Sequence, residues 1–399
     1  MNDFIQLNLQ LNRRVLCIQS HVILGFTGGK MTFCVFEATE GLSFDWISTV
    51  QYVSGSLHEG TELKQSEMKT LLQGVYELVY KPLQKYIDNK VNLLDISVNL
   101  RPYDIILSGY IADPLTLNEI HKFVTNIKDN CITRNPFWIC DPVLGDHGTF
   151  YVSKELVEVY LEILHTVDIL TPNQFEFIQL ARKLKKSANI LPHLKTNMDI
   201  TGEQKLSELN QLEIFNRETY NENIYGGISL MQSIEYCKLL LETGLKNIIV
   251  TSLNLIDDFD HLFTLLATYN SNAIATCFPN VKLDLENCKV NVVTIRYKQI
   301  VHSKIFYGMG DLFAALFTSF LSEYDGDLCF PILKAIYITH YIIKYNINIS
   351  REVTTESESS SVRPLYLSSK LLEKALLEIN QMNGDTLLSL YDIKIHRIE

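Results

Sequence analysis

The residues best suited to chemistry lie in the segment Gly308-Met309-Gly310-Asp311. Two glycines one residue apart let a backbone turn tightly and approach an anion closely. The apolar run Leu312 to Phe317 follows at once and predicts a helix, whose free N–H groups and positive dipole end would favour phosphate. A carboxylate such as Asp311 suits this place if it takes the proton from a hydroxyl that attacks a phosphoryl group. The alternative is an acidic residue that merely stabilises the first helical turn.

Polar residues also follow the other apolar runs that are typical of strands. Ligands of an open α/β sheet bind beyond the carboxyl ends of its strands, so these residues are expected to lie together. Asp141, Asp146, Asn173 and Glu176 offer the oxygen donors that Mg²⁺ prefers. The alternatives are turn chemistry for the aspartates and a helix-capping pair for Asn173 and Glu176. In chain order the strand ends carry Ser20 and His21, Tyr52 with Ser54 and Ser56, Tyr110, Asp141 and Asp146, Thr171 to Glu176, Thr251 and Ser252, and Gly308 to Asp311.

Three features of the sequence allow more than one interpretation. The Gly-rich turn Phe26 to Lys30 precedes a helical segment, but it lacks the spacing of a Walker loop. Ser252 either holds a nucleotide phosphate or simply ends its strand. His21 is either a catalytic side chain or an imidazole that packs or faces solvent.

Apolar strands alternate with amphipathic helices along most of the chain. This alternation predicts an α/β protein with three layers, in which helices cover both faces of a mostly parallel sheet. Two later runs, 262–269 and 292–297, predict a hairpin of antiparallel strands at the sheet edge. The predicted strands are 15–20, 44–52, 103–109, 137–141, 167–170 and 247–252, and the predicted helices include 31–39, 68–86, 154–164, 174–183, 230–242, 332–347 and 367–381.

The segment 184–228 interrupts this rhythm, because it is polar and rich in Asn, Lys and Glu. We interpret it as a surface insertion that is partly disordered. The rest predicts a single domain over residues 1–399 with a C-terminal helical extension at about 362–399.

The composition narrows the function classes. The chain has 399 residues, 47% of them hydrophobic, and a formal net charge of -11. An acidic chain without a long basic run is a poor nucleic-acid binder. Its eight cysteines form no C-x-x-C pair, so a structural zinc site is not expected. The polar N-terminus lacks the apolar core of a signal peptide and no apolar run could span a bilayer, so we expect a cytoplasmic protein, with the nucleus as an additional location.

Several of these blocks together resemble the pyridoxal kinases of the ribokinase-like superfamily. They are VLCIQSHVILG at 15–25, CDPVLGD at 140–146, TPNQFE at 171–176, Val250 to Ser252, and GMGDLFAA at 308–315. The order and spacing fit up to about Tyr345, apart from the insertion, with a weaker echo at Val362-Arg363-Pro364.

The resemblance implies ATP-dependent phosphorylation of the 5′-hydroxymethyl group of pyridoxal, pyridoxine or pyridoxamine. It also implies Mg²⁺ and a monovalent cation, K⁺, as cofactors, and a homodimer. By position, Asp311 would be the catalytic base, and Gly308, Met309 and Gly310 would form the anion hole. The remaining implied residues are Asp141, Asn173, Thr251, Ser252 and the lid residue Tyr151 for ATP, Ser20, Tyr52, Ser56 and Tyr110 for the vitamer, and Asp141, Asp146 and Glu176 for the metal.

The sequence departs from the family pattern in the substrate pocket and the anion hole. The usual GTGD has Met309 in place of Thr, and the backbone N–H remains while the hydroxyl is lost. The usual GYVGNK is Gly25 to Lys30 here, with Gly29 for Asn. The usual SNHTGY is Val53 to His58, with Gly55 for His, and the lid after Asp146 is shorter.

These departures leave three interpretations. The first is a pyridoxal kinase. The second is a catalytically weak or inactive kinase homologue that binds nucleotide or vitamer as a regulatory protein. The third is a hydroxymethylpyrimidine-type kinase.

Overall fold

The structure, a computed structural model, describes residues 13–39, 42–82, 102–130, 135–196, 228–270, 272–274, 290–300, 305–321, 326–353, 362–364 and 367–398. Most of the segment interpreted as an insertion, 197–227, lies outside these residues. Its first part, up to Thr196, continues the helix α7 (Gln174–Thr196), so that part is regular helix and not irregular chain.

Ten strands of the described residues form one mixed sheet, in the order β14-β11-β10-β9-β8-β5-β4-β1-β2-β3. The six strands from β9 to β2 are parallel, and antiparallel strands flank them at both edges. The predicted α/β class is therefore confirmed. The strands are β1 (Arg13–Leu24), β2 (Leu42–Ser54), β3 (Gly60–Glu62), β4 (Ile105–Ser108), β5 (Phe137–Cys140), β8 (Ile169–Leu170), β9 (Asn247–Leu255), β10 (Asp258–Thr268), β11 (Val290–Lys298) and β14 (Asp392–Ile398).

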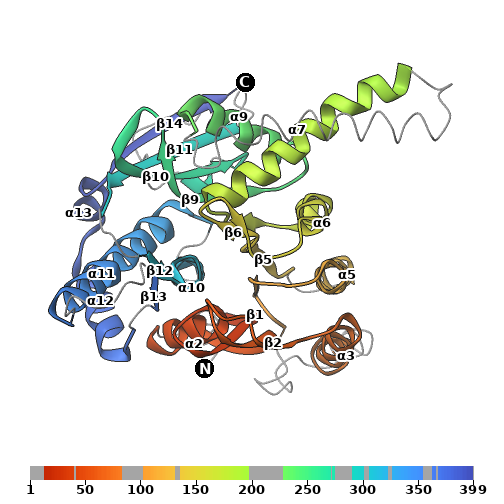
Figure 1. Ribbon diagram of the computed structural model, residues 1–399, viewed down its shortest axis with the longest axis horizontal. Helices are drawn as coiled ribbons and strands as arrows, with labels where there is room; N and C mark the ends of the chain where they lie inside the picture. The colour runs from red at the N-terminus through yellow and green to blue at the C-terminus, as the bar shows by residue number, and fades with distance from the viewer. Residues whose placement is uncertain are drawn as a thin grey trace, which may run out of the picture.

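Helices cover both faces of this sheet, which gives the three layers (Figure 1). The helices of one face pack into one apolar core and those of the other face into a second core. The first face carries α3 (Gln65–Val75), α5 (Pro114–Asn130), α6 (Glu155–Ile163), α7 and α9 (Leu230–Leu241), and the second carries α2 (Gly28–Ala38), α10 (Met309–Leu321), α11 (Cys329–Val353), α12 (Ser369–Gln381) and α13 (Gly384–Ser389).

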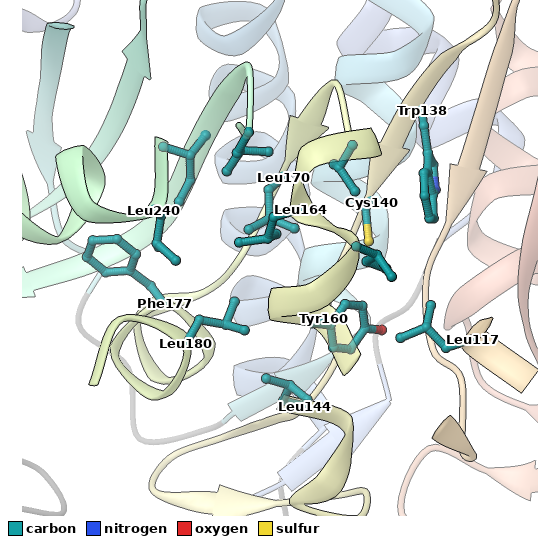
Figure 2. Close-up of a cluster of buried hydrophobic side chains, with 14 of the residues drawn as sticks. Leu117, Trp138, Cys140, Leu144, Tyr160, Leu164, Leu170, Phe177, Leu180 and Leu240 are labelled. Atoms are coloured by element: carbon teal, nitrogen blue, oxygen red, sulfur yellow. The ribbon is translucent and has the colours of Figure 1, made fainter. Parts of the chain in front are cut away.

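The sequence of β1 explains why both faces are apolar. Val15 and Cys17 point into one core, while Leu16 and Ile18 point into the other, and all four are buried. Successive side chains of a strand alternate between faces, so a continuous apolar run is what a central parallel strand requires. Figure 2 shows part of the first core, a cluster formed by side chains of β5 (Trp138, Cys140), α5 (Leu117), α6 (Tyr160) and α7 (Phe177, Leu180).

One edge of the sheet differs from the prediction. The strands β10 and β11 are antiparallel, as expected, with Leu262 opposite Tyr297. They do not form the edge, however, because β14 pairs with β11 from Val290↔Ile398 to Arg296↔Asp392. The C-terminal segment is thus not wholly helical, since it ends in a strand whose partner lies about a hundred residues away in sequence.

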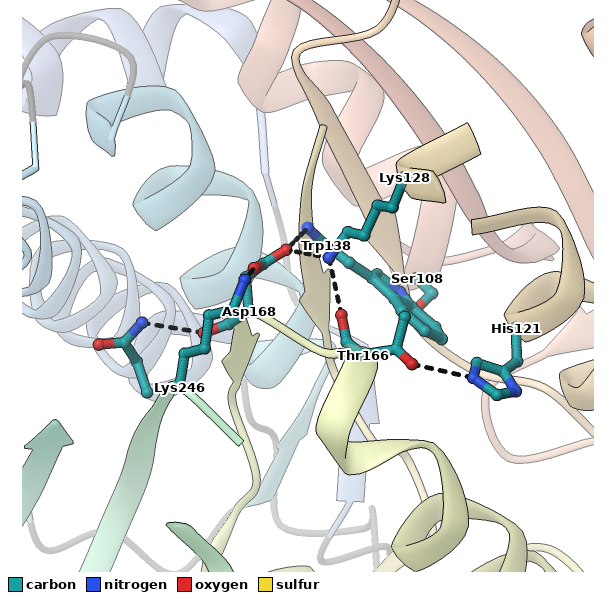
Figure 3. A network of polar contacts seen from close by, with 8 residues as sticks. Ser108, His121, Lys128, Trp138, Thr166, Asp168 and Lys246 are labelled. Atoms are coloured by element: carbon teal, nitrogen blue, oxygen red, sulfur yellow. Dashed lines mark hydrogen bonds and ion pairs between the residues drawn. The ribbon is translucent and has the colours of Figure 1, made fainter. Parts of the chain in front are cut away.

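A polar network ties the amino ends of three central strands together (Figure 3). The buried Asp168, just before β8, accepts hydrogen bonds from the Trp138 backbone N–H at 2.8 Å and from the Lys128 and Lys246 ammonium groups, each at 2.5 Å. Its backbone carbonyl accepts a hydrogen bond from Asn247 at the start of β9. This network therefore lies at the end of the sheet opposite to the polar strand ends identified above.

The described residues include no helix with the length and apolar character needed to cross a membrane.

Candidate active site

Two cavities adjoin at the carboxyl ends of the parallel strands. The first has a volume of about 270 Å³ and the second of about 1150 Å³. The predicted site residues that line the first cavity are Ser20, Tyr52, Tyr110, Asp141, Asp146, Tyr151, Asn173, Glu176, Thr251 and Gly308 to Asp311. The side chains and backbone that line both cavities are those of Asp146, His147, Asn173, Thr251, Met309 and Gly310.

The turn before α10 lies where the cavities meet, and its glycines are required by geometry. Gly308 has φ +82°, and a Cβ there would lie 2.3 Å from the carbonyl oxygen of Phe26. A Cβ on Gly310 would lie 3.9 Å from Asp141 Oδ2, so this glycine faces that carboxylate. Since α10 begins at Met309, the predicted turn at a helix N-terminus is confirmed. The strand β12 (Ile305–Tyr307), which leads into the turn, pairs with β13 (Val362–Pro364) and so brings the segment of weaker resemblance beside it.

Three carboxylates gather around this turn: Asp141 and Glu176 are buried, and Asp311 is half-buried. Burial raises the pKa of Asp141, and repulsion by Asp311 raises it further. Burial raises the pKa of Asp311, although the backbone N–H of Gly28 at the start of α2 opposes that effect. Burial likewise raises the pKa of Glu176, and repulsion from Asp141 is the second cause of this rise. No Lys or Arg of the described residues lines the first cavity, so a bound cation would supply the counter-charge to these carboxylates.

The donor set around these carboxylates fits Mg²⁺ of the kind that phosphates and water help to hold. Mg²⁺ in such sites takes one or two protein carboxylates and completes its shell with phosphate oxygens and waters. In the part of the chain that the structure describes, no three His, Cys, Asp or Glu side chains form a ready-made metal site. Asp141 is 5% exposed and its repulsive surroundings favour a bound cation, while Asp146 lies on both cavities.

Asn173 and Glu176 form the capping pair that was the alternative to metal binding. The backbone N–H of Asn173 donates to Glu176 Oε2 at 2.8 Å, and that of Glu176 donates to Asn173 Oδ1 at 3.0 Å. Glu176 Oε1 accepts from the Leu144 N–H, and Asn173 Nδ2 donates to the Gly145 carbonyl at 2.9 Å. The pair therefore fixes the turn that carries Asp146 onto the start of α7, and the geometry shows this structural role directly.

A tight hairpin carries Asp146 to the junction of the cavities. The strands β6 (Gly145–Asp146) and β7 (Thr149–Phe150) are joined by His147 and Gly148, whose φ angles are 48° and 81°. Two left-handed residues make the turn whose twist suits a two-residue hairpin. Tyr151 follows the hairpin and lines the first cavity, not the second.

The first cavity is walled by aromatic residues on its β2 side. Tyr52 is buried, donates to Glu62 Oε1 at 2.5 Å, and stacks on His58 at a ring separation of 5.1 Å. Burial raises the pKa of Tyr52, and its hydrogen bond to Glu62 raises the pKa further, so the phenol stays neutral. Ser56 lines neither cavity, whereas Ser54 of the same turn lines the first, and the Ser54 and Ser56 hydroxyls are 3.1 Å apart.

Thr251 and Ser252 lie at a bulge in β9. The pairing with β10 shifts register between Val250 and Leu253, and Ser252 has φ 53°. Bulges of this kind re-aim side chains next to functional sites. Thr251 lines both cavities and Ser252 lines the second alone.

Two of the departures from the family pattern have structural explanations. A Cβ on Gly29 would lie 2.2 Å from the ring of Trp46, so that ring occupies the space of the missing side chain. At Gly55 a Cβ would find ordinary contacts, at 3.4 Å from Thr27 Cγ2 and 3.8 Å from Tyr307. The backbone at Gly55 therefore tolerates a side chain, and the absence of one leaves more space beside the first cavity that Gly55 lines.

Sequence reasoning missed much of the second cavity. Tyr297 of β11 and His340 of α11 stack edge to face at 4.8 Å, and both line it, as does Thr339. Burial lowers the pKa of His340 to about 4, so its ring is neutral at physiological pH. No local motif marks these residues, because they lie within a strand and a helix whose patterns predict core.

The comparisons with known proteins can be set against this geometry. No family model matches the chain. It is 25% identical to pyridoxal kinase of Sus scrofa over 366 residues, which cover 89% of each protein. It is 33% identical to a putative pyridoxal kinase of Caenorhabditis elegans over 178 residues, 44% of this chain and about half (52%) of that relative. A solved structure of Plasmodium falciparum PdxK with AMP-PNP and PL superposes with a TM-score of 0.60 at 23% identity, covering 97% of this chain and 99% of that one.

The three layers, the mostly parallel sheet and the glycine turn at the strand ends define a protein of the ribokinase-like fold. Within that fold, the chain is similar to pyridoxal kinase of Sus scrofa over most of both sequences.

Proposed function

We propose that this protein transfers the γ-phosphoryl group of ATP to the 5′-hydroxymethyl group of pyridoxal, pyridoxine or pyridoxamine. One observation carries the proposal: Gly310 and the turn that ends in Asp311 lie where two cavities of different size meet. A small, aromatic-walled cavity suits a substituted pyridine, and a larger one suits a nucleotide. The named relatives are pyridoxal kinases, which supports this choice of acceptor.

In this proposal Asp311 is the general base. Its carboxylate accepts the proton of the acceptor hydroxyl as that oxygen bonds to the γ-phosphorus, and the bond from phosphorus to the ADP oxygen breaks. The backbone N–H groups at the start of α10 stabilise the charge on the transferring group. Its raised pKa makes Asp311 a stronger base than an exposed aspartate, which suits proton abstraction near neutral pH.

The vitamer would occupy the first cavity, against Ser20, Tyr52 and Tyr110. Ser56 remains assigned to the vitamer by resemblance alone, and it would have to turn inward to reach it. ATP would occupy the second cavity, with its phosphates toward Thr251 and Ser252.

Two further residues, both near the hairpin of β6 and β7, are proposed to contact ATP. Asn173 lines both cavities, and Tyr151, which the resemblance assigns to a lid, lines the first. Tyr151 is 41% exposed, as a lid residue that closes on a ligand would be before that ligand binds.

Mg²⁺ would be held by Asp141 and Asp146, with Glu176 contributing through water because both of its oxygens already accept backbone N–H groups. When bound, the ion would neutralise phosphate charge. It would also relieve the repulsion that raises the pKa of Asp141. A monovalent cation, K⁺, a homodimer and a cytoplasmic or nuclear location are proposed on the resemblance. Residues 1–399 are proposed as one kinase domain with the insertion at 184–228.

The test is incubation of the purified protein with MgATP, K⁺ and pyridoxal, followed by detection of the phosphorylated product. Product at a steady rate supports the proposal. ATP binding without product at high enzyme concentration would instead favour a regulatory homologue. Product from hydroxymethylpyrimidine but not from pyridoxal would favour the other kinase class.

A further inference from the structure

Thr27 carries a hydroxyl that the fold leaves without a partner. It is the N-cap residue of α2, yet its side chain makes no capping hydrogen bond. Its Oγ1 is buried and has no hydrogen-bond partner among the described residues. A buried hydroxyl in this state costs free energy, so it signals either a missing ligand or an alternative rotamer.

The position of Thr27 connects this hydroxyl to the phosphoryl-transfer turn. Thr27 lines the first cavity together with the whole segment Gly308 to Asp311. Its methyl carbon Cγ2 would lie 3.1 Å from a Cβ on Gly308 and 3.4 Å from a Cβ on Gly55. The methyl group is therefore the part of Thr27 that contacts the turn, while the hydroxyl is buried without a partner among the described residues.

The turn itself lacks a side-chain donor. Met309 contributes a thioether, which accepts hydrogen bonds weakly and donates none. A rotation of Thr27 by one staggered step about χ1 would bring its hydroxyl to the place that the methyl group holds, and would move the methyl group to the place of the Cβ hydrogen. The hydroxyl would then face the turn from the N-terminus of a second helix, α2, whose Gly28 N–H already acts on Asp311.

We propose that Thr27 is the side-chain hydroxyl donor of this anion site, and that its Oγ1 turns to the transferring phosphoryl group when substrates bind. It supplies the hydrogen bond that Met309 cannot make. The inference rests on the proposed function for the identity of the bound group. The unpartnered hydroxyl and its contact with the turn are independent of that function.

The test is Thr27→Val, which keeps the shape and removes the hydroxyl. We expect kcat for pyridoxal to fall about 10- to 100-fold, the loss typical of one hydrogen bond to a charged group. The Kd for MgAMP-PNP should stay within about twofold, and the melting temperature of the ligand-free protein should not fall, because no native hydrogen bond is removed. Thr70→Val is the control, since Thr70 is exposed on α3 and bonds only to its own helix.

A double-mutant comparison separates this role from a structural one. In a Met309→Thr background the turn has its own hydroxyl, so Thr27→Val should lower kcat by about threefold at most. An equal loss in both backgrounds, or a fall in melting temperature with unchanged kcat, would overturn the inference.

A third measurement keeps the inference testable if the wild-type protein gives no product. MgADP with fluoroaluminate mimics the transferring group, and its stabilisation of the protein in the presence of pyridoxal can be measured by thermal unfolding. A smaller shift for Thr27→Val than for wild type, with equal shifts for MgADP alone, supports the hydrogen bond. Equal shifts in both conditions refute it.

Discussion

Asp311→Asn is expected to remove catalysis while it stabilises the ligand-free protein. The substitution keeps the size of the side chain and removes its charge and basicity. A positioned general base contributes about 10²- to 10⁴-fold to a rate. We therefore expect kcat to fall by about this factor. Each tenfold fall in rate corresponds to about 1.36 kcal/mol, so the activation free energy should rise by about 2.7–5.4 kcal/mol.

The gain in stability follows from the carboxylates that surround Asp311. Burial raises the pKa of Asp311, and its charge in turn raises that of Asp141. A carboxyl whose folded pKa is raised favours folding below the ordinary value of 3.8, and this contribution is lost as the pH rises through the folded pKa. Asn cannot ionise, so Asp311→Asn does not lose stability as the pH rises. The variant should therefore have the same free energy of unfolding as wild type at or below pH 3.8, and an increasingly higher one above it.

Two measurements check the expected fall in kcat and the expected gain in stability. Initial rates of product formation at saturating MgATP give kcat, and thermal or urea unfolding across pH gives stability. Affinity for MgATP should be equal to or higher than that of wild type, since a charge that repels phosphate is gone. Asp385→Asn is the matched control, because Asp385 is an exposed first-turn aspartate of α13 and should change kcat by less than about twofold.

Retention of most of the rate by Asp311→Asn would refute the assignment of the base. A loss of about 0.3–1 kcal/mol of stability, equal to that of the control, would mean that Asp311 acts only on the helix dipole.

Four further substitutions, in two pairs, test the scaffold. Asp168→Asn leaves the largely buried Lys128 ammonium without its anion, so it should lower the free energy of unfolding, measured by denaturation, by about 3–5 kcal/mol. The Lys246 side chain is 60% exposed, so Lys246→Met should lower it by only about 0–1 kcal/mol. Gly308→Ala should cost about 1–3 kcal/mol and most of the turnover, because its left-handed backbone and the nearby carbonyl exclude a Cβ. Gly74→Ala, in the open helix surface of α3, should stabilise by about 0.5–1 kcal/mol in the same assay. Stability losses of equal size for the two members of either pair would contradict the structural reasoning.

The glycine turn was predictable because its signal is local. A Gly-x-Gly-Asp sequence before an apolar helical run fixes a turn, a helix start and an acidic first turn within a few residues. The parallel sheet was predictable for a similar reason, since each apolar strand is followed by an amphipathic helix. The capping pair Asn173 and Glu176 was also readable, and its metal-ligand interpretation remains a proposal.

Other parts of the site depend on which segments meet in space. The resemblance implied Ser56 as a vitamer contact, whereas Ser54, Gly55 and His58 are the residues of that turn that line the first cavity. Tyr297 and His340 give the second cavity its aromatic wall, although each sits in a segment whose pattern predicts core. The strand β14 could not be predicted as an edge strand, because its pairing partner β11 lies far away in sequence.

The sequence by itself determined the elements and the order of the polar strand ends, because periodicity and turn residues act over a few neighbouring positions. Only the tertiary structure decided that Asp311 repels Asp141 and that Asp141 repels Glu176, since electrostatic interaction depends on distance and burial. It also decided that Thr27 lies against Gly308 with an unpartnered hydroxyl, because the meeting of two helix N-termini is set by the packing of the sheet.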